Sequence, residues 1–425
     1  MARMRILLSS SPCGYSFEPL TVITRDLEEC PHRVFRVHRP LGPFVKREDG
    51  IYIAIRAADI EMLATDPRTR QVETELVVSH GVIQGPLFDF AKHSMVLSNG
   101  IEHRCRRAPL ARAFTPTFLS ELRPRIRAIA DELIDECMTA RSMDLVADYC
   151  TAIPARVNAL VLGIPAADIP DFTRHVYSLA RLFTPAFTSK LAPQLQNSAR
   201  QLLHYVEDLL DERSHPRNDF LTSFLEALGD PESLSHLEAL TQIVTMILGG
   251  SDTTRTALAI QVALLLQHRE QWQAVCANQA LIPGAVLESL RYEPPIGSYA
   301  RVTLEDLDID GWVVPRNRIL WLSTLAALRD PAIYADPDRF DINRADHPRR
   351  HPVFGAGAHH CLGEALAKVQ LEEGLAAVAT RIPSLRLVGE RPPIHGSGGI
   401  RTIPELRLSR SVDSWRARRR PRILE

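Results

Sequence analysis

The chain lacks an excess of charge of either sign. Its 425 residues carry 50 Lys and Arg against 51 Asp and Glu, which leaves a formal net charge of −1. No basic surplus therefore points to nucleic acid as a partner, and no acidic surplus points to a disordered chain. Hydrophobic residues make up 45% and charged residues 24% of the sequence, which is typical of a globular protein with a large buried core.

Long apolar runs are also missing. The N-terminal run of Ile6, Leu7 and Leu8 ends at three serines and a proline, residues 9–12. A membrane span needs about 18 apolar residues, and a secretory leader needs a longer apolar region than this one. We therefore expect a cytoplasmic protein that makes no membrane contact.

The seven cysteines show no paired spacing. They are an odd number, widely scattered, and no two stand at the two-residue spacing that zinc and redox sites favour. A disulfide framework is therefore not expected. No segment of about 20 to 50 residues repeats, which excludes solenoid and array architectures.

Helical patterns dominate what is present. Short β-like runs such as residues 51–55 precede residue 102, and the pattern is then mostly helical up to about Arg291. Two short strands are expected within residues 312–321, and a further helix over residues 363–380. The longest helix is expected over residues 237–269, about 50 Å at 1.5 Å per residue. The predicted fold class is mainly α with small β-sheets.

Residues 354–363 read Phe-Gly-Ala-Gly-Ala-His-His-Cys-Leu-Gly and place one cysteine among small residues. Glycines let a backbone approach a flat partner closely. Cys361 also stands just before a run of helix formers, and a helix N-terminus favours a thiolate. Such a thiolate suits a metal ligand, or a nucleophile with His359 or His360 as its base. The third interpretation is a buried structural cysteine.

Residues 249–254 read Gly-Gly-Ser-Asp-Thr-Thr in the middle of the long predicted helix. Two glycines and three hydroxyl residues lower helix propensity there. This pattern is typical of a kink that leaves room for a ligand or water. Alternatively, Asp252 and Thr253 cap a second helix that begins at this point.

Together these segments resemble the cytochrome P450 monooxygenases. Residues 354–363 match the family's Phe-x-x-Gly-x-His-x-Cys-x-Gly haem-binding loop, and residues 249–253 resemble its oxygen-binding groove, Ala/Gly-Gly-x-Asp/Glu-Thr. The resemblance implies the family's fold, with haem b between the long central helix and the helix that follows the cysteine loop. It makes Cys361 the axial thiolate ligand of the iron, and it assigns Asp252 and Thr253 to the proton delivery that cleaves the O–O bond of dioxygen.

Further motifs match the family in the same order. Glu288 and Arg291 match its Glu-x-x-Arg pair, and Arg339 in a Pro-x-Arg-Phe segment matches the third, structural partner. His103 and Arg107 are four apart, so they share a helix face, and they match the family's haem-propionate clamp. The cofactor contacts that the resemblance implies are His103, Arg107, Gly249, Arg301, Phe354, Gly357, His359, Cys361 and Gly363.

The resemblance implies one domain over residues 20–408, with an N-terminal extension (1–19) and a basic C-terminal tail (409–425). It implies a haem-thiolate monooxygenase that inserts one oxygen atom of O2 into a mainly apolar small organic substrate, by hydroxylation or O-dealkylation. The substrate pocket is expected to use residues 77–97 and 179–191. Single residues expected there are Thr245, Leu248, Ile296 and Tyr299. The alternatives are a haem-thiolate sensor, or a haem-thiolate isomerase or peroxide-using enzyme.

Electrons must come from other proteins, because the chain has no room for a flavin domain and no cluster-like cysteine spacing. We expect them to pass from NAD(P)H through a ferredoxin reductase and a ferredoxin to a monomeric enzyme. The docking surface expected for an acidic ferredoxin is a basic patch. Its residues are Arg104, Arg106, Arg112, Arg349 and Arg350.

Overall fold

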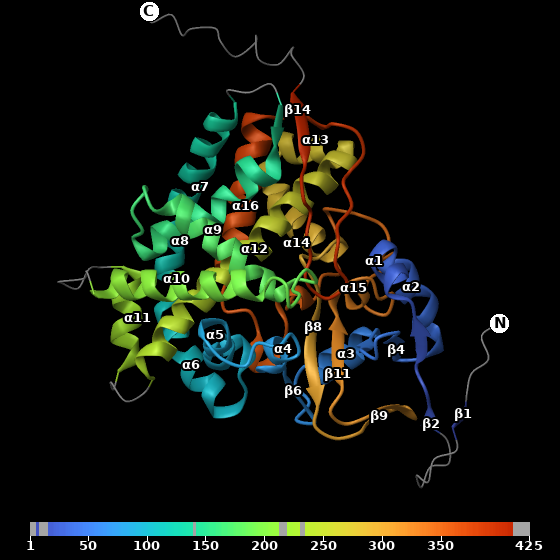
Figure 1. Ribbon diagram of the computed structural model, residues 1–425. Coiled ribbons are helices and arrows are strands. Elements are labelled where there is room, and N and C mark those ends of the chain that lie inside the picture. The colour runs from blue at the N-terminus through green and yellow to red at the C-terminus, as the bar shows by residue number, and fades with distance from the viewer. Residues whose placement is uncertain (1–5, 8–15, 139–141, 212–218, 230–233, 411–425) are drawn as a thin grey trace, which may run out of the picture.

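The computed structural model describes residues 6–7, 16–138, 142–211, 219–229 and 234–410. Within them, helices form most of the molecule; most labelled strands lie together on one side, and β14 lies at another end of the molecule (Figure 1). The predicted class, mainly α with small sheets, is confirmed, because helices account for more than half of the described residues. Most of the predicted N-terminal extension and nearly all of the basic tail lie outside the described residues.

Helices build the larger part of the described molecule. Those of eight or more residues in the described segments are α2 (Pro31–His38), α5 (Pro86–His93), α6 (Gly100–Ala113), α7 (Pro116–Cys137), α8 (Ala152–Leu162), α9 (Ile169–Ala180), α10 (Ala192–Asp211), α11 (Phe220–Leu228), α12 (His236–Gln267), α13 (Arg269–Ala277), α14 (Ile282–Tyr292) and α16 (Glu364–Arg381). Shorter ones are α1 (Thr24–Glu29), α3 (Ala57–Leu63), α4 (Glu75–Val78) and α15 (Thr324–Ala327). Across the described ranges, none is long and apolar enough to cross a membrane.

The longest helix, α12, runs through the middle of the helical region (Figure 1). Its N-terminus is closed by a capping box, in which the hydroxyl of Ser235 accepts from the amide of Glu238 and the carboxylate of Glu238 accepts from the amide of Ser235. Most of its side chains are buried, because α8, α9, α10, α14 and α16 pack around it. Both ends of α12 lie within two residues of the predicted limits, and α16 confirms the helix expected over 363–380.

Three sheets flank the helices. The largest has the order β13-β8-β11-β5-β4-β3, and β6 also pairs with β8, at residues 301–303. Its strands are β3 (Leu20–Val22), β4 (Phe44–Arg47), β5 (Tyr52–Ala54), β6 (Thr69–Gln71), β8 (Ile296–Thr303), β11 (Ile319–Ser323) and β13 (Gly399–Ile400). The second contains β1 (Ile6–Leu7), β2 (Ser16–Phe17), β9 (Leu307–Ile309) and β10 (Trp312–Val314), and the third β7 (Ser142–Asp144), β12 (Leu385–Leu387) and β14 (Arg407–Arg410). The strands expected within 51–55 and 312–321 are therefore confirmed.

Helices α12 and α16 approach each other closely at one point. A Cβ atom at Gly374 of α16 would lie 3.1 Å from Leu258 of α12 and 3.2 Å from Ile153 of α8. The hydroxyl of Tyr149 donates to the Gly374 carbonyl over 2.8 Å in the same buried region. Because glycine has no side chain, Gly374 lets these helices pack this closely.

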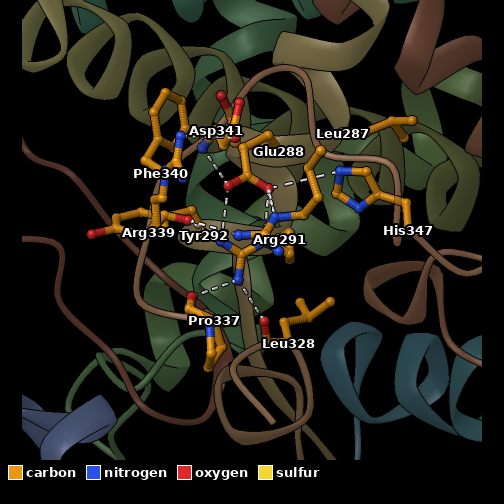
Figure 2. Close-up of polar contacts among 12 residues, drawn as sticks. Leu287, Glu288, Arg291, Tyr292, Leu328, Pro337, Arg339, Phe340, Asp341 and His347 are labelled. Atoms are coloured by element: carbon orange, nitrogen blue, oxygen red, sulfur yellow. Dashed lines mark hydrogen bonds and ion pairs between the residues drawn. The ribbon is translucent and has the colours of Figure 1, made fainter. Parts of the chain in front are cut away.

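A buried ion cluster ties α14 to the loop that follows α15 (Figure 2). Glu288 accepts from Nε and Nη2 of Arg291 over 2.7 and 2.8 Å, and both side chains are fully buried. Arg291 also donates to the carbonyls of Leu328, Pro337 and Arg339 at 2.8–3.0 Å. These bonds satisfy the buried charges, which would otherwise be costly.

The expectation that the side chain of Arg339 joins this cluster is wrong. That side chain is 67% exposed and pairs with Asp341, so only its carbonyl faces Arg291. The third charged member of the cluster is Arg344, whose Nε lies 3.2 Å from Oε2 of Glu288 and whose side chain is 6% exposed. His347 follows at 3.7 Å. The chain turns after residue 339, and this turn brings the arginine five positions later back to Glu288.

The two arginines give a matched test of this arrangement. Arg344→Ala removes a buried partner of Glu288, and we expect it to lower the free energy of unfolding by about 3 kcal/mol. Arg339→Ala removes an exposed side chain and should cost less than about 0.5 kcal/mol. Urea unfolding of the purified holoprotein measures both. A larger loss for Arg339→Ala than for Arg344→Ala would contradict the arrangement.

Candidate functional site

A cavity of about 350 Å³ lies against one face of α12. Its opposite wall is the cysteine loop, residues 354–363, with the first turns of α16. Helix α6 and strand β8 supply further lining residues. Most lining side chains are apolar, as in pockets that hold small organic molecules. Among the described residues that line it, none is Asp or Glu.

Cys361 lies at the end of its loop and lines this cavity. Its amide donates to the carbonyl of Phe354 over 2.7 Å, which closes the loop. Gly357 has φ of +63°, and a Cβ there would lie 2.6 Å from Cγ2 of Thr65, so only glycine fits. The backbone therefore fixes where the sulfur atom stands.

The electrostatics of the sulfur atom are mixed. Burial raises the pKa of the Cys361 thiol, whereas a hydrogen bond from the Gly363 amide and the charge of Arg107 act in the opposite direction. An amide that faces the sulfur favours the thiolate, as expected just before a helix. A buried thiolate still needs a cation beside it, which a metal ion would supply.

The expected propionate residues meet at one edge of the cavity. The rings of His103 on α6 and His359 lie 4.0 Å apart, centroid to centroid. Arg107, one turn after His103, donates to the carbonyl of His360 over 2.6 Å. Arg301 on β8 also lines the cavity. Three separate elements thus bring four nitrogen-bearing side chains to one place.

Burial sets the protonation of the two histidines. It lowers the pKa of His103 to about 4 and that of His359 to about 3, with neighbouring arginines adding to both shifts. Each imidazole is therefore neutral near pH 7 and offers one N–H donor. Arg107 and Arg301 keep their positive charge. Two guanidinium groups and two imidazole donors, with no carboxylate among the described lining residues, are suited to an anionic ligand.

Gln71 was not predicted as a site residue. It stands opposite Arg301 in the β6–β8 register, and its Oε1 accepts from Arg301 over 2.6 Å. Both side chains line the cavity. This pair could not be predicted from a sequence pattern, because the two residues are 230 positions apart and β6 has only three residues.

Helix α12 presents small and polar residues to the cavity. It is continuous through residues 249–254, so the interpretation in which Asp252 and Thr253 cap a second helix is wrong. The hydroxyl of Thr253 donates to the Gly249 carbonyl over 2.7 Å and lines the cavity. An added Cβ at Gly249 would meet no described atom within 4 Å.

Asp252 lies beside the cavity rather than in its lining. It is 3% exposed and forms an ion pair with Arg255, whose guanidinium stands 4.8 Å from the ring of Tyr177. Burial raises the pKa of Asp252, and Arg255 opposes this shift. Its carboxyl group is therefore held away from Thr253 in this conformation.

Of the expected pocket residues, Thr245, Ile296 and Tyr299 line the cavity, but Leu248 does not. At about 100° per residue, Leu248 lies off one edge of the α12 stripe that faces the cavity and packs in the core instead. The ranges 77–97 and 179–191 contribute only Met95 and Val96. Their aromatic and leucine side chains belong to the core, and Ile83 is 68% exposed.

The cavity fits a flat, anionic group that carries a metal ion. An added Cβ at Gly249 on one wall or Gly363 on the other would meet no described atom within 4 Å. The thiol of Cys361 stands on one wall, and cationic and N–H donors stand at one edge. Haem has this shape and this charge distribution, with propionates at one edge and an iron that binds a thiolate.

Comparisons with known proteins agree with this site. The family model described as Cytochrome P450 matches residues 178–381. The plant-inducible cytochrome P450-pinF1 of Rhizobium radiobacter is 41% identical over 397 residues, which cover 93% of this chain and 94% of that protein. Mycinamicin IV hydroxylase/epoxidase of Micromonospora griseorubida is 35% identical over 303 residues, 70% and 75% of the two chains. The crystal structure of CalO2 superposes with a TM-score of 0.84 at 26% identity and covers 91% of this chain and 97% of that one.

The relatives are bacterial, and several are named as hydroxylases or oxygenases. The match to cytochrome P450-pinF1 spans nearly the whole chain. The chain belongs to the cytochrome P450 family and is an oxygenase of the bacterial type.

Proposed function

We propose that the chain is a haem-thiolate monooxygenase in which Cys361 is the axial ligand of haem b. The observation that carries this proposal is the half-buried thiol of Cys361, which shares one cavity with Thr253 of α12 and with the donors at the cavity edge. When bound, the haem supplies the activation of O2 and the insertion of one oxygen atom into the substrate. A sensor, an isomerase or a peroxide-using enzyme remains the alternative.

The chain would hold the cofactor at three places. Cys361 would bind the iron, and its position is fixed by the hydrogen bond from its amide to the carbonyl of Phe354. His103, Arg107, Arg301 and His359 bind the propionates. Phe354, Gly249, Gly357 and Gly363 leave room for the ring or shape the loop around it. Gln71 keeps the guanidinium of Arg301 at the cavity edge.

Proton movement would begin at Thr253. Its hydroxyl donates to the carbonyl of Gly249, so its oxygen can accept a hydrogen bond from a donor in the cavity. Rotation of the O–H away from that carbonyl would let the hydroxyl donate into the cavity, and the proton it gives up would be replaced by the one that its oxygen accepts. Asp252 would take part after its carboxyl turns from Arg255 toward this hydroxyl. Its raised pKa favours the protonated form that a proton donor needs.

The substrate proposed is a mainly apolar small organic molecule, hydroxylated or O-dealkylated. Met95, Val96 and Ile296 supply apolar contacts, and Thr245 and Tyr299 supply hydroxyl groups. The proposed place of action is the cytoplasm, in keeping with thiols rather than disulfides at Cys30, Cys105, Cys150, Cys276 and Cys361.

Electrons are proposed to come from NAD(P)H through a ferredoxin reductase and an acidic ferredoxin. The expected docking patch needs one correction, because Arg106 is 7% exposed and binds Glu238 over 2.8 Å. The revised patch is Arg104, Arg112, Arg349 and Arg350, all of them exposed.

Substitution of Thr253 tests the proton step. Thr253→Ala should retain haem and the substrate-induced spin-state change, because neither needs the hydroxyl. Product formation should fall at least about tenfold, since positioned proton donors contribute factors of about 10² to 10⁴. The electrons consumed should appear as hydrogen peroxide, which a peroxide assay measures against NAD(P)H oxidation.

Thr256→Ala is the matched control, because Thr256 is a buried threonine of α12 that bonds to the Arg401 carbonyl and does not line the cavity. In this variant the electrons from NAD(P)H should still go into product rather than into hydrogen peroxide. If Thr253→Ala also put all its electrons into product, the role of Thr253 in proton delivery would be contradicted.

Charge reversal tests the docking patch. Arg104→Glu combined with Arg112→Glu should slow reduction by an acidic ferredoxin at least about tenfold at low salt, because charge complementarity steers association. The difference from wild type should shrink as salt screens the charges. Stopped-flow reduction measures both effects, with Arg316→Glu in the β10–β11 turn as the control. Unchanged rates and an unchanged salt dependence would overturn the patch.

A further inference from the structure

Three polar side chains of α12 form a stripe along one face. Glu238, Gln242 and Thr245 stand four and three residues apart, which places them one above the other on the helix. They face residues 92–97, which we call the α5–η2 segment because it joins the end of α5 to the 3-10 turn η2 (Met95–Leu97).

Hydrogen bonds join this stripe to the backbone of the α5–η2 segment. The amide of Met95 donates to Oε1 of Gln242 over 2.9 Å, and Nε2 of Gln242 donates to the carbonyl of His93 over 2.9 Å. The hydroxyls of Ser94 and Thr245 lie 3.0 Å apart. One glutamine side chain therefore binds the segment on both sides of Ser94.

Arg106 of α6 extends the connection. Its Nε and Nη2 donate to Glu238 over 3.1 and 2.8 Å, and its Nη1 donates to the carbonyl of Lys92 over 3.1 Å. Ser94 and Gln242 are fully buried, and Thr245 is 4% exposed. Buried groups of this kind are costly when left without partners, so the segment is held in one position rather than in several.

The α5–η2 segment carries Met95 and Val96, which line the cavity. Val96 is 41% exposed, so packing against the core does little to hold it. Met95 also packs in the hydrophobic core, and the polar bonds from α12 fix the backbone that carries both side chains. Gln242 itself does not line the cavity.

We propose that Gln242 is a positioning residue for the substrate: it fixes the α5–η2 segment so that Met95 and Val96 form the outer wall of the cavity. The inference rests on the proposed function, because it takes the cavity to hold the haem and the substrate together. It makes the selectivity of the enzyme for large ligands depend on a residue that never touches them.

Two azole probes of different size test this inference on the ferric holoprotein. Imidazole needs only the iron in order to bind, whereas the phenyl group of 4-phenylimidazole must also fit against the wall that Met95 and Val96 form. In Gln242→Leu the Kd of 4-phenylimidazole should rise roughly tenfold, as expected for lost buried hydrogen bonds, and that of imidazole should change less than about twofold. Amide hydrogen exchange in residues 92–97 should become faster.

Gln261→Leu is the matched control. Gln261 is also a buried glutamine of α12, but its Nε2 donates to the carbonyl of Leu371, away from the α5–η2 segment. It should leave both Kd values and the exchange of residues 92–97 unchanged. Ser94→Ala is the second variant if Gln242→Leu fails to fold, and it should weaken 4-phenylimidazole roughly threefold, because it removes one bond to α12.

Wild-type binding of 4-phenylimidazole by Gln242→Leu or, where that variant fails to fold, by Ser94→Ala would overturn the inference, and so would an equal loss in Gln261→Leu. If imidazole gives no iron–nitrogen spectrum with the wild-type protein, the proposed function fails instead. Hydrogen exchange of residues 92–97 then decides alone whether Gln242 holds the segment, and unchanged exchange would overturn it.

Discussion

A cavity lined by the thiol of Cys361 must stay open inside a close-packed helical protein, and the arrangement of α12 and α16 meets this constraint. Near Gly374 the two helices touch so closely that a Cβ would not fit without movement. Toward the cysteine loop, Gly249 and Gly363 face open space. The same pair of helices thus packs tightly at one point and leaves room for a cofactor at the other.

Charge is distributed to match this geometry. Carboxylates that would repel an anionic cofactor are missing from the described lining, and the donors at the cavity edge come from α6, β8 and the cysteine loop. The acid that the structure buries most deeply, Glu288, is placed elsewhere and is neutralised by Arg291 and Arg344. That cluster joins α14 to the loop after α15, and this loop leads along the chain to the cysteine loop.

Most of the features that could be predicted from the sequence are local, because they depend on residues close together in the chain. The long helix, the cysteine loop and the pairing of Glu288 with Arg291 depend on residues a few positions apart, so periodicity and motif spacing located them. The roles of Arg344 and Gln71 depend on how the chain turns and how strands pair, and no short pattern encodes either. Leu248 and Asp252 show a related limit, because helical spacing alone did not define the edge of the cavity-facing stripe.

The central claim is that Cys361 binds the haem iron from within this cavity. The most direct measurement is the absorption spectrum of the reduced carbon monoxide complex of the wild-type protein and of Cys361→His. We expect the strongly red-shifted Soret band of thiolate ligation in the wild type and its loss in the variant. A wild-type protein that binds haem without this band, or a variant that keeps it, would contradict the claim.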